Sequence, residues 1–167
     1  MRIRYTLVDC PLGRLLVAGT RKGISAVSVG KSDRILESAL LAEYPAAEIS
    51  RDEAGLREYV TVLLKYLSAE ESHLDLPLDI QITAFQRRVY EALRAVPYGQ
   101  TRTYEEIAKA IGRSGAARAV ARACATNPAA IVIPCHRVVR EDGALGGYRW
   151  GIEAKKALLD KEKIETP

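Results

Sequence analysis

The stretch Thr103-Tyr-Glu-Glu-Ile-Ala-Lys-Ala-Ile-Gly-Arg-Ser-Gly-Ala-Ala-Arg-Ala-Val-Ala-Arg-Ala-Cys124 predicts two short helices joined by a tight turn. Thr103 is a typical N-cap for a helix over 104–111. The segment 112–115 ends that helix, and Ser114 is the expected cap of the next one, over about 115–125. Two short helices joined by a glycine-containing turn are typical of a helix-turn-helix.

Two further helices are expected in the second half of the chain. Thr83, with a glutamine three residues later, is the capping-box pattern and opens a helix over 84–95. The chain closes with a helix over 152–163. The expected buried side of that last helix consists of Ala154, Ala157, Leu158 and Leu159.

The first half of the chain has a different pattern. Short segments rich in β-formers alternate with turn residues, which predicts a small antiparallel meander with strands over 3–8, 15–18 and 24–29. Two amphipathic helices are expected over 33–43 and 53–67. The chain is therefore predicted to be an α+β protein with a small sheet-and-helix lobe at 1–80 and a mostly helical domain at 81–167.

Charge is distributed unevenly between the two halves. Residues 1–80 hold 10 Lys/Arg and 12 Asp/Glu, whereas residues 81–167 hold 15 Lys/Arg and 9 Asp/Glu, so the net charge of +4 comes from the second half. A basic domain indicates a polyanionic partner, with nucleic acid first among the candidates. The alternative is a solvated basic face with no partner.

Composition excludes several classes of protein. No apolar run approaches the ~18 residues of a membrane-spanning helix, so no membrane association is expected. The N-terminus MRIRYTLVDC lacks the apolar stretch of a signal peptide, which predicts a cytoplasmic location. Cys10, Cys124 and Cys135 are too few for a disulfide framework. With only His73 and His136 beside them, we expect no metal site and no cofactor.

Cys135 is the residue that points most directly to chemistry. It follows the apolar run 131–134, which predicts a short strand, and it precedes His136 and an arginine. A cysteine reacts as the thiolate, and a neighbouring histidine or arginine lowers its pKa. Because successive side chains of a strand point to opposite faces, His136 could assist only through a bend or a bridging water. The alternative is a structural cysteine, which is our interpretation of Cys10 and Cys124.

The helix expected over 115–125 is unusually bare, because alanine occupies most of its positions, including Ala116 and Ala117. Such a helix can approach a nucleic-acid groove closely. Arg118 and Arg122 lie four residues apart on one face and can reach phosphates or enter a base stack. A core helix whose arginines extend to water is the alternative, but the place of this helix in a helix-turn-helix favours DNA.

Four glycines between residues 143 and 151 predict a loop, which carries Tyr148 and Trp150. Aromatic side chains on a flexible loop suit a planar ligand such as a base. The alternative is a loop that pins one aromatic side chain into the core.

These residues together resemble the O6-alkylguanine-DNA alkyltransferases, the methylated-DNA–protein-cysteine methyltransferases. The Pro-Cys-His-Arg-Val core is highly specific, and the N-terminal lobe matches less closely. The matching segments are Phe85-Gln-Arg-Arg-Val-Tyr-Glu-Ala-Leu-Arg, Val96-Pro-Tyr-Gly-Gln-Thr, Asn127-Pro, Ile133-Pro-Cys-His-Arg-Val-Val and Gly147-Tyr-Arg-Trp-Gly.

The resemblance implies a ribonuclease-H-like N-terminal lobe followed by a helix-turn-helix domain, and it implies direct DNA repair. Such a protein binds duplex DNA through the minor groove as a monomer and flips an O6-alkylguanine, or an O4-alkylthymine, out of the stack. It then transfers the alkyl group to its own cysteine. The thioether is not hydrolysed, so each molecule acts once and needs no cofactor.

The resemblance also implies roles for individual residues. Cys135 would be the alkyl acceptor, His136 the general base acting through a water, and Glu162 the carboxylate that orients this histidine. Asn127 would be the hinge between the recognition helix and the acceptor.

Other residues of the family pattern concern DNA and the substrate. Arg118 would enter the duplex where the guanine leaves, and Tyr104 would help to rotate the target phosphate. Because Trp150 stands where other members have smaller residues, we expect it to restrict the pocket to small adducts. The implied walls of the guanine pocket are Tyr148, Val138, Arg149 and Trp150.

The chain lacks two features that some members of this family have, and three other functions remain to be weighed against repair. The zinc site that some relatives hold in the N-terminal lobe has no counterpart beyond Cys10 and His73. The cysteine cluster of a regulatory module is also absent, which predicts no regulatory role.

The presence of Cys135 argues against a non-catalytic alkyltransferase-like protein, which would only bind alkylated DNA. A transcription factor would need side chains that read base edges, and the helix expected over 115–125 offers only arginine for this. A cysteine hydrolase would need an oxyanion hole, and no motif indicates one.

Overall fold

The computed structural model describes residues 1–165, and within it the chain forms two compact units. Unit 1 contains residues 1–80 and 128–132, and unit 2 contains residues 81–127 and the chain from 133 onward. The segment 128–132 belongs to unit 1 because it pairs with a strand there. The Val27 N–H donates to the Pro128 carbonyl at 3.0 Å, and the Ala130 N–H donates to the Val27 carbonyl at 2.9 Å.

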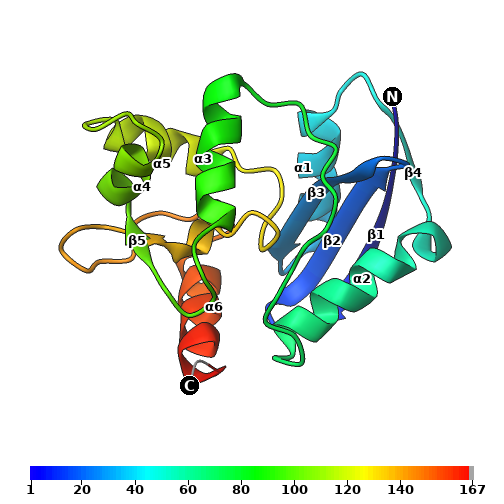
Figure 1. The fold of residues 1–167 in the computed structure, drawn as a ribbon. Helices are drawn as coiled ribbons and strands as arrows, with labels where there is room; N and C mark the ends of the chain where they lie inside the picture. The colour runs from blue at the N-terminus through cyan, green and yellow to red at the C-terminus, as the bar shows by residue number, and fades with distance from the viewer. Residues whose placement is uncertain (166–167) are drawn as a thin grey trace. The chain divides into compact units, whose positions relative to one another are not determined.

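Unit 1 is built on a four-stranded sheet with the strand order β3-β2-β1-β4 (Figure 1). The first three strands form the antiparallel meander that the sequence predicted, and β4 adds to it parallel to β1. Strand β4 was not predicted, because it is short and mostly polar. The bounds are β1 Arg2–Cys10, β2 Gly13–Thr20, β3 Gly23–Gly30 and β4 Glu48–Arg51.

Two helices pack on this sheet, and both confirm the sequence prediction: α1 spans Asp33–Glu43 and α2 spans Glu53–Leu67. Helix α1 covers one face, where its Leu36 and Leu40 join a buried cluster with Ile3, Leu7 and Leu16. Helix α2 packs against β1 and β2.

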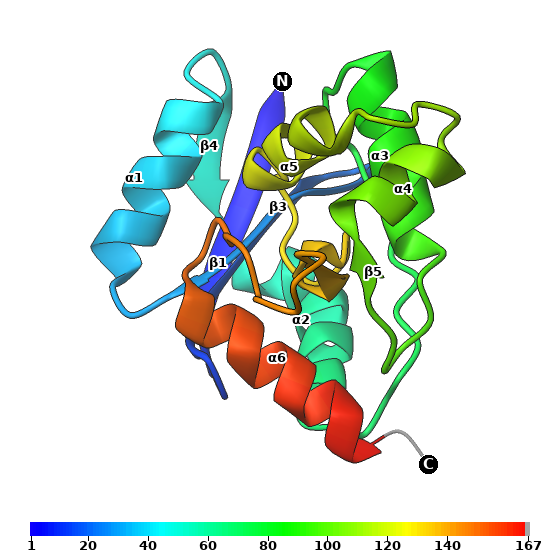
Figure 2. The same ribbon diagram turned by 90° about the vertical axis from the view of Figure 1, so that its left-hand side faces the viewer.

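Unit 2 is mostly helical, as predicted. A single turn of 3-10 helix, η1 (Cys135–Arg137), follows α5 and precedes α6 in the chain and packs against α6. Figures 1 and 2 show the helices α3, α4, α5 and α6 of this unit. The short parallel strands β5 (Arg102–Thr103) and β6 (Val138–Val139) pair with each other. No helix within residues 1–165 combines the length and the apolar character that crossing a bilayer requires. The helices are α3 Ala84–Arg94, α4 Tyr104–Ala110, α5 Ala117–Ala125, η1 Cys135–Arg137 and α6 Ile152–Glu165.

The threonine caps predicted for unit 2 are present. The Thr83 hydroxyl accepts a hydrogen bond from the Gln86 N–H at 3.1 Å, and the Gln86 side chain accepts one from the Thr83 N–H at 2.9 Å. Thr103 and Glu106 form a second capping box at the start of α4. Each box satisfies two N–H groups that a helix terminus otherwise leaves unpaired.

The prediction that Ser114 caps α5 is wrong. Helix α5 begins after Ala116, which makes no side-chain cap hydrogen bond. Ser114 instead donates its hydroxyl to Glu105 at 3.3 Å, and the Gly115 N–H donates to the same carboxylate at 2.6 Å. The Glu105 carboxylate thus holds the turn between the two helices.

The buried side of α6 was only partly predicted. Leu158 is buried and Ala154 and Leu159 are half-buried, but Ala157 is exposed. Two further buried positions of α6 carry charged side chains, and a pattern of apolar residues does not reveal such positions. These buried charged residues are Lys155 and Glu162.

We expect Thr83→Ala to lower the free energy of unfolding by about 1 kcal/mol, because the substitution removes one N-cap acceptor. The matched variant Ser114→Ala should change it by less than about 0.5 kcal/mol, since Ser114 caps no helix. Urea titrations followed by far-ultraviolet circular dichroism measure both. Equal losses in the two variants would contradict this assignment of the caps.

Candidate active site

The segment that leads into Cys135 is not the strand that the sequence predicted. Residues 131–133 form a turn in which Ile131 has a φ of 75°, and Cys135–Arg137 is a turn of 3-10 helix. The apolar run is buried without pairing as a strand of a sheet, and a short apolar run does not distinguish these cases. In the 3-10 turn Cys135 and His136 no longer alternate between opposite faces as they would in a strand.

A pocket of about 210 Å³ lies beside Cys135 in unit 2. This volume is below the ~300–1,000 Å³ typical of sites for drug-sized ligands, so it suits one small planar group. The pocket is formed by α4, α5, η1 and the loop between β6 and α6. Its lining residues are Tyr104, Ala121, Cys124, Ala125, Cys135, Gly147, Tyr148 and Arg149.

Asn127 connects three parts of the site. Its side-chain amide donates to the Cys135 sulfur at 3.1 Å and to the Ile133 carbonyl at 2.9 Å. Its own carbonyl accepts a hydrogen bond from Arg149 at 2.6 Å. Asn127, two residues beyond the end of α5, is therefore tied both to the Cys135 thiol and to the loop that lines the pocket.

The thiol of Cys135 is buried, and this changes its chemistry. Burial raises the pKa of Cys135 well above its ordinary value, and the neighbouring Cys124 adds to the increase, while Asn127 and the charge of Lys155 oppose it. The sequence had suggested a lowered pKa from the adjacent His136 and arginine. That expectation is wrong because burial of the thiol dominates and both neighbouring side chains bind Glu162 instead, so the thiol is protonated at neutral pH.

The structure brings His136, Arg137 and Glu162 together, although Glu162 is 26 positions from His136. The His136 Nε2 atom is hydrogen-bonded to one Glu162 oxygen, and Arg137 donates to the other at 2.7 Å. A second Arg137 donor binds the Val96 carbonyl at 2.8 Å. All three side chains are buried, so the carboxylate is enclosed by its two partners.

The ionisation of this group follows from its surroundings. Burial acts to raise the pKa of Glu162, but the hydrogen bonds from His136 and Arg137 and the charge of Arg137 outweigh it and lower the pKa to about 2. Burial lowers the pKa of His136 despite its contact with Glu162. Glu162 is therefore a carboxylate and His136 a neutral imidazole. The other ring nitrogen of His136, Nδ1, is buried and has no hydrogen-bond partner among the described residues.

Lys155 is a residue of this site that the sequence analysis missed. Its buried ammonium group donates to the carbonyls of Val138 at 2.6 Å, Gly147 at 3.1 Å and Leu145. Burial lowers the pKa of Lys155 to about 8. Lys155 thus fixes the backbone of the loop that carries Tyr148 and Arg149. Its spacing from Leu158 and Glu162, at i, i+3 and i+7, is the signal that could have revealed it.

The predicted pocket walls separate into two groups. Tyr148 and Arg149 line the pocket, whereas Trp150 and Val138 are not among its lining residues. The Trp150 ring packs edge-on against Tyr148, with 5.2 Å between ring centroids, and the Arg149 guanidinium lies 5.4 Å from the indole. Trp150 therefore supports the wall and does not narrow the pocket. Burial raises the pKa of Tyr104, on another wall, to about 12.

The residues predicted to meet DNA lie along α5. Arg118 and Arg122 are exposed, while Ala116 and Ala117 are half-buried at the start of the helix. Arg118 is three and seven residues from Ala121 and Ala125, which line the pocket. Residues at these spacings share one helix stripe, so Arg118 lies on the stripe that continues to the pocket.

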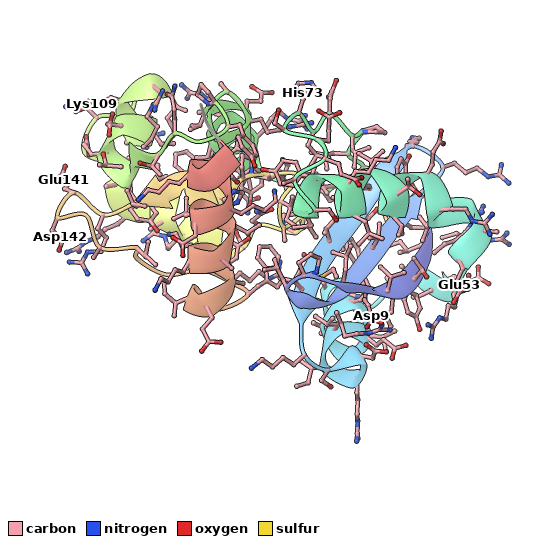
Figure 3. The ribbon with its side chains drawn as sticks, turned by 90° about the horizontal axis from the view of Figure 1, so that it is seen from below. Asp9, Glu53, His73, Lys109, Glu141 and Asp142 are labelled. Carbon is pink, nitrogen blue, oxygen red and sulfur yellow. The ribbon has the colours of Figure 1, made fainter. Side chains whose placement is uncertain are left out.

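The described residues show no potential metal centre. Within residues 1–165, no three His, Cys, Asp or Glu side chains gather as metal ligands would. In unit 1, Asp9, Glu53 and His73 lie apart from one another (Figure 3).

We expect Glu162→Gln to lower the free energy of unfolding above pH 4.5 by about 3 kcal/mol, the equivalent of a pKa lowered from 4.5 to about 2. A depressed carboxyl pKa stabilises the folded state above the unfolded pKa, and this contribution disappears as pH falls toward 2. The difference between variant and wild type should therefore shrink over that range in urea titrations. The control Glu153→Gln, on the exposed side of α6, should show no such convergence.

Comparison with known proteins places this geometry in a family. Residues 3–80 match the ribonuclease-like domain of 6-O-methylguanine DNA methyltransferases, and residues 84–164 match their DNA binding domain. The bifunctional transcriptional activator/DNA repair enzyme Ada of Escherichia coli is 48% identical over 97% of this chain. The chain spans 46% of the length of Ada.

Other relatives match over nearly their whole length. The methylated-DNA–protein-cysteine methyltransferase of Mycobacterium bovis is 42% identical, and the alignment covers 99% of this chain and 95% of that protein. The crystal structure of Mycobacterium tuberculosis OGT in complex with DNA has a TM-score of 0.80 and 37% identity, and covers 100% of this chain and 96% of that one. The chain therefore belongs to the 6-O-methylguanine DNA methyltransferase family, over both its ribonuclease-like and its DNA-binding domain.

Proposed function

We propose that this protein repairs DNA by transferring the alkyl group of an O6-alkylguanine in duplex DNA to the sulfur of Cys135, once per molecule. The observation that carries the proposal is a buried thiol on the wall of a base-sized pocket, held by Asn127 and followed directly by the His136–Glu162 pair. Family membership and the names of the relatives support the same reaction. O4-alkylthymine presents an equivalent alkyl–oxygen bond and is a second substrate.

The transfer exchanges a proton for an alkyl group. The Cys135 sulfur forms a bond to the alkyl carbon as the carbon–O6 bond breaks, the thiol proton passes to His136, and the released guanine takes up one proton. The neutral His136 has a buried Nδ1 atom without a partner among the described residues, and a water can bridge it to the thiol. Glu162 then stabilises the imidazolium, as a carboxylate behind a catalytic histidine does.

The product explains why the protein acts once. A thioether is a poor leaving group, and the site supplies no group that would displace it from Cys135. This distinguishes the protein from a cysteine hydrolase, whose acyl intermediate is released by water. The presence of the thiol distinguishes it from an alkyltransferase-like protein that only binds damaged DNA.

DNA binding follows from the exposed stripe of α5 and the small residues around it. The narrow minor groove admits a helix with few large side chains, and Arg118, on the stripe that leads to the pocket, fills the space that the flipped base leaves. Tyr104 and Tyr148, on the pocket walls, receive the base. One copy of the chain carries every group that this reaction uses, so it acts as a monomer. The reaction needs a reduced thiol and access to DNA, so we propose that the protein acts in the cytoplasm.

Cys135→Ser should abolish alkyl transfer, because a serine hydroxyl is a far weaker nucleophile than a thiolate. The test is incubation with duplex DNA that carries labelled O6-methylguanine, followed by counting of label on the protein. The control Cys10→Ser, in β1 of unit 1, should accept one alkyl group per molecule like the wild type. Transfer by Cys135→Ser at the wild-type rate would overturn the proposed function.

Arg118→Ala should slow repair of duplex DNA more than reaction with free O6-benzylguanine, since Arg118 stabilises only the flipped state. Rates with the two substrates, measured on one preparation, give the ratio directly. The control Arg87→Ala, an exposed arginine on α3, should leave this ratio unchanged. Equal slowing on both substrates would show that Arg118 serves the chemistry or the fold and not base flipping.

A further inference from the structure

The pocket contains two thiols, and the proposed reaction uses only one of them. Cys124 on α5 and Cys135 on η1 both line it, and the two residues are 8% and 3% exposed. The two thiols therefore face the same cavity of about 210 Å³. The sequence interpretation of Cys124 as a packing residue is therefore incomplete, because its sulfur lies where the alkyl group arrives.

A thiol at position 124 works against the first transfer. Burial raises the pKa of Cys135, and the neighbouring Cys124 thiol raises it further. Alanine occupies the neighbouring lining positions 121 and 125, so packing alone does not require sulfur here. The ammonium group of Lys155 lies close enough to interact with the charge of either sulfur, and a nearby cation favours a thiolate.

We propose that Cys124 is a second acceptor, which captures two-carbon alkyl groups that carry a leaving group, such as 2-chloroethyl, after Cys135 has accepted them. The product is an ethylene bridge between the two sulfurs. This inference rests on the proposed transfer to Cys135 and extends it to bifunctional adducts.

The chemistry balances without an oxidant or a reductant. Transfer forms the bond between the Cys135 sulfur and the first carbon and breaks the carbon–O6 bond. The same sulfur then displaces chloride from the second carbon, which gives a three-membered cyclic sulfonium. The Cys124 sulfur attacks a ring carbon and opens the ring, and the Cys124 proton leaves to solvent. The by-product of this second stage is HCl, and both sulfurs end as thioethers.

The position of Cys124 decides the fate of the sulfonium. Water or a DNA base would otherwise open the ring, and a DNA base would leave the protein cross-linked to its substrate. A nucleophile held in the same buried pocket has an effective concentration that far exceeds that of a group arriving from solution. Capture by Cys124 therefore prevents the cross-link and leaves free, repaired DNA.

The test uses the full chain and a duplex with one freshly prepared O6-(2-chloroethyl)guanine, beside a duplex with O6-methylguanine. Trypsin cleaves after Arg122 and Arg137, so one peptide, 123–137, contains both cysteines. After iodoacetamide treatment, the bridged peptide carries an ethylene group in place of two thiol hydrogens and no carbamidomethyl group. The uncaptured product carries a hydroxyethyl group on Cys135 and a carbamidomethyl group on Cys124.

We expect the bridged peptide to dominate in the wild type and in the control Cys10→Ser. In Cys124→Ser its share of all alkylated peptide should fall at least about tenfold, with more hydroxyethyl product and more protein–DNA cross-link. Because shares are taken only over molecules that have accepted the alkyl group, the speed of transfer in the variant does not affect them.

The two duplexes separate the possible failures. Methylated Cys135 from the O6-methylguanine duplex, together with hydroxyethylated Cys135 and carbamidomethylated Cys124 from the other, would overturn this inference and leave the proposed function standing. Absence of alkyl groups on Cys135 from both duplexes would overturn the proposed function, and this inference with it. If Cys124→Ser does not fold, the wild-type peptide alone decides between the bridged and the open product.

Discussion

The carboxylate of Glu162 is the group on which the geometry of the site depends. It is buried on α6 and accepts hydrogen bonds from His136 and Arg137, which are adjacent in the chain. A buried carboxylate that loses its partners costs several kcal/mol, so both donors must reach it from the same side of the backbone. An extended strand would direct them apart, and the 3-10 turn lets both reach Glu162. Cys135, at the start of that turn, is then left on the pocket wall.

The local part of the fold was largely predictable from the sequence. Helices α1 and α2 have the predicted bounds, and the threonine capping boxes are formed, because periodicity and caps depend on residues close in the chain. Two of the errors concern segments whose conformation depends on distant partners. Strand β4 exists because β1 offers it an edge. The run 131–133 is a buried turn beside a segment that pairs with β3, and its composition resembles that of a strand.

The site was less predictable than the fold, because its geometry also depends on residues that are distant in the chain. Local sequence identified Cys135, but its neighbours suggested a lowered pKa, since sequence does not reveal that His136 and Arg137 bind a carboxylate on α6. Only the family resemblance linked Glu162 to His136. Lys155 and Cys124 were passed over because a lysine in a helix is usually exposed and a cysteine among alanines usually packs. Both residues depend on groups from other parts of the chain. Lys155 binds three loop carbonyls, and Cys124 lies beside the Cys135 thiol.

The single-use acceptor that we propose must stay unreactive in solution and still react with damaged DNA, and burial of its thiol meets both requirements. A permanently ionised, exposed thiolate would react with electrophiles and oxidants in solution and would be consumed before it met damaged DNA. Burial keeps Cys135 protonated and therefore unreactive, while the neutral His136, backed by Glu162, stands ready to take the proton. Reaction then requires a base in the pocket, which supplies the electrophilic carbon and excludes water at the same time. In the proposed reaction, selectivity for DNA damage thus arises because the thiolate forms only when the substrate is bound.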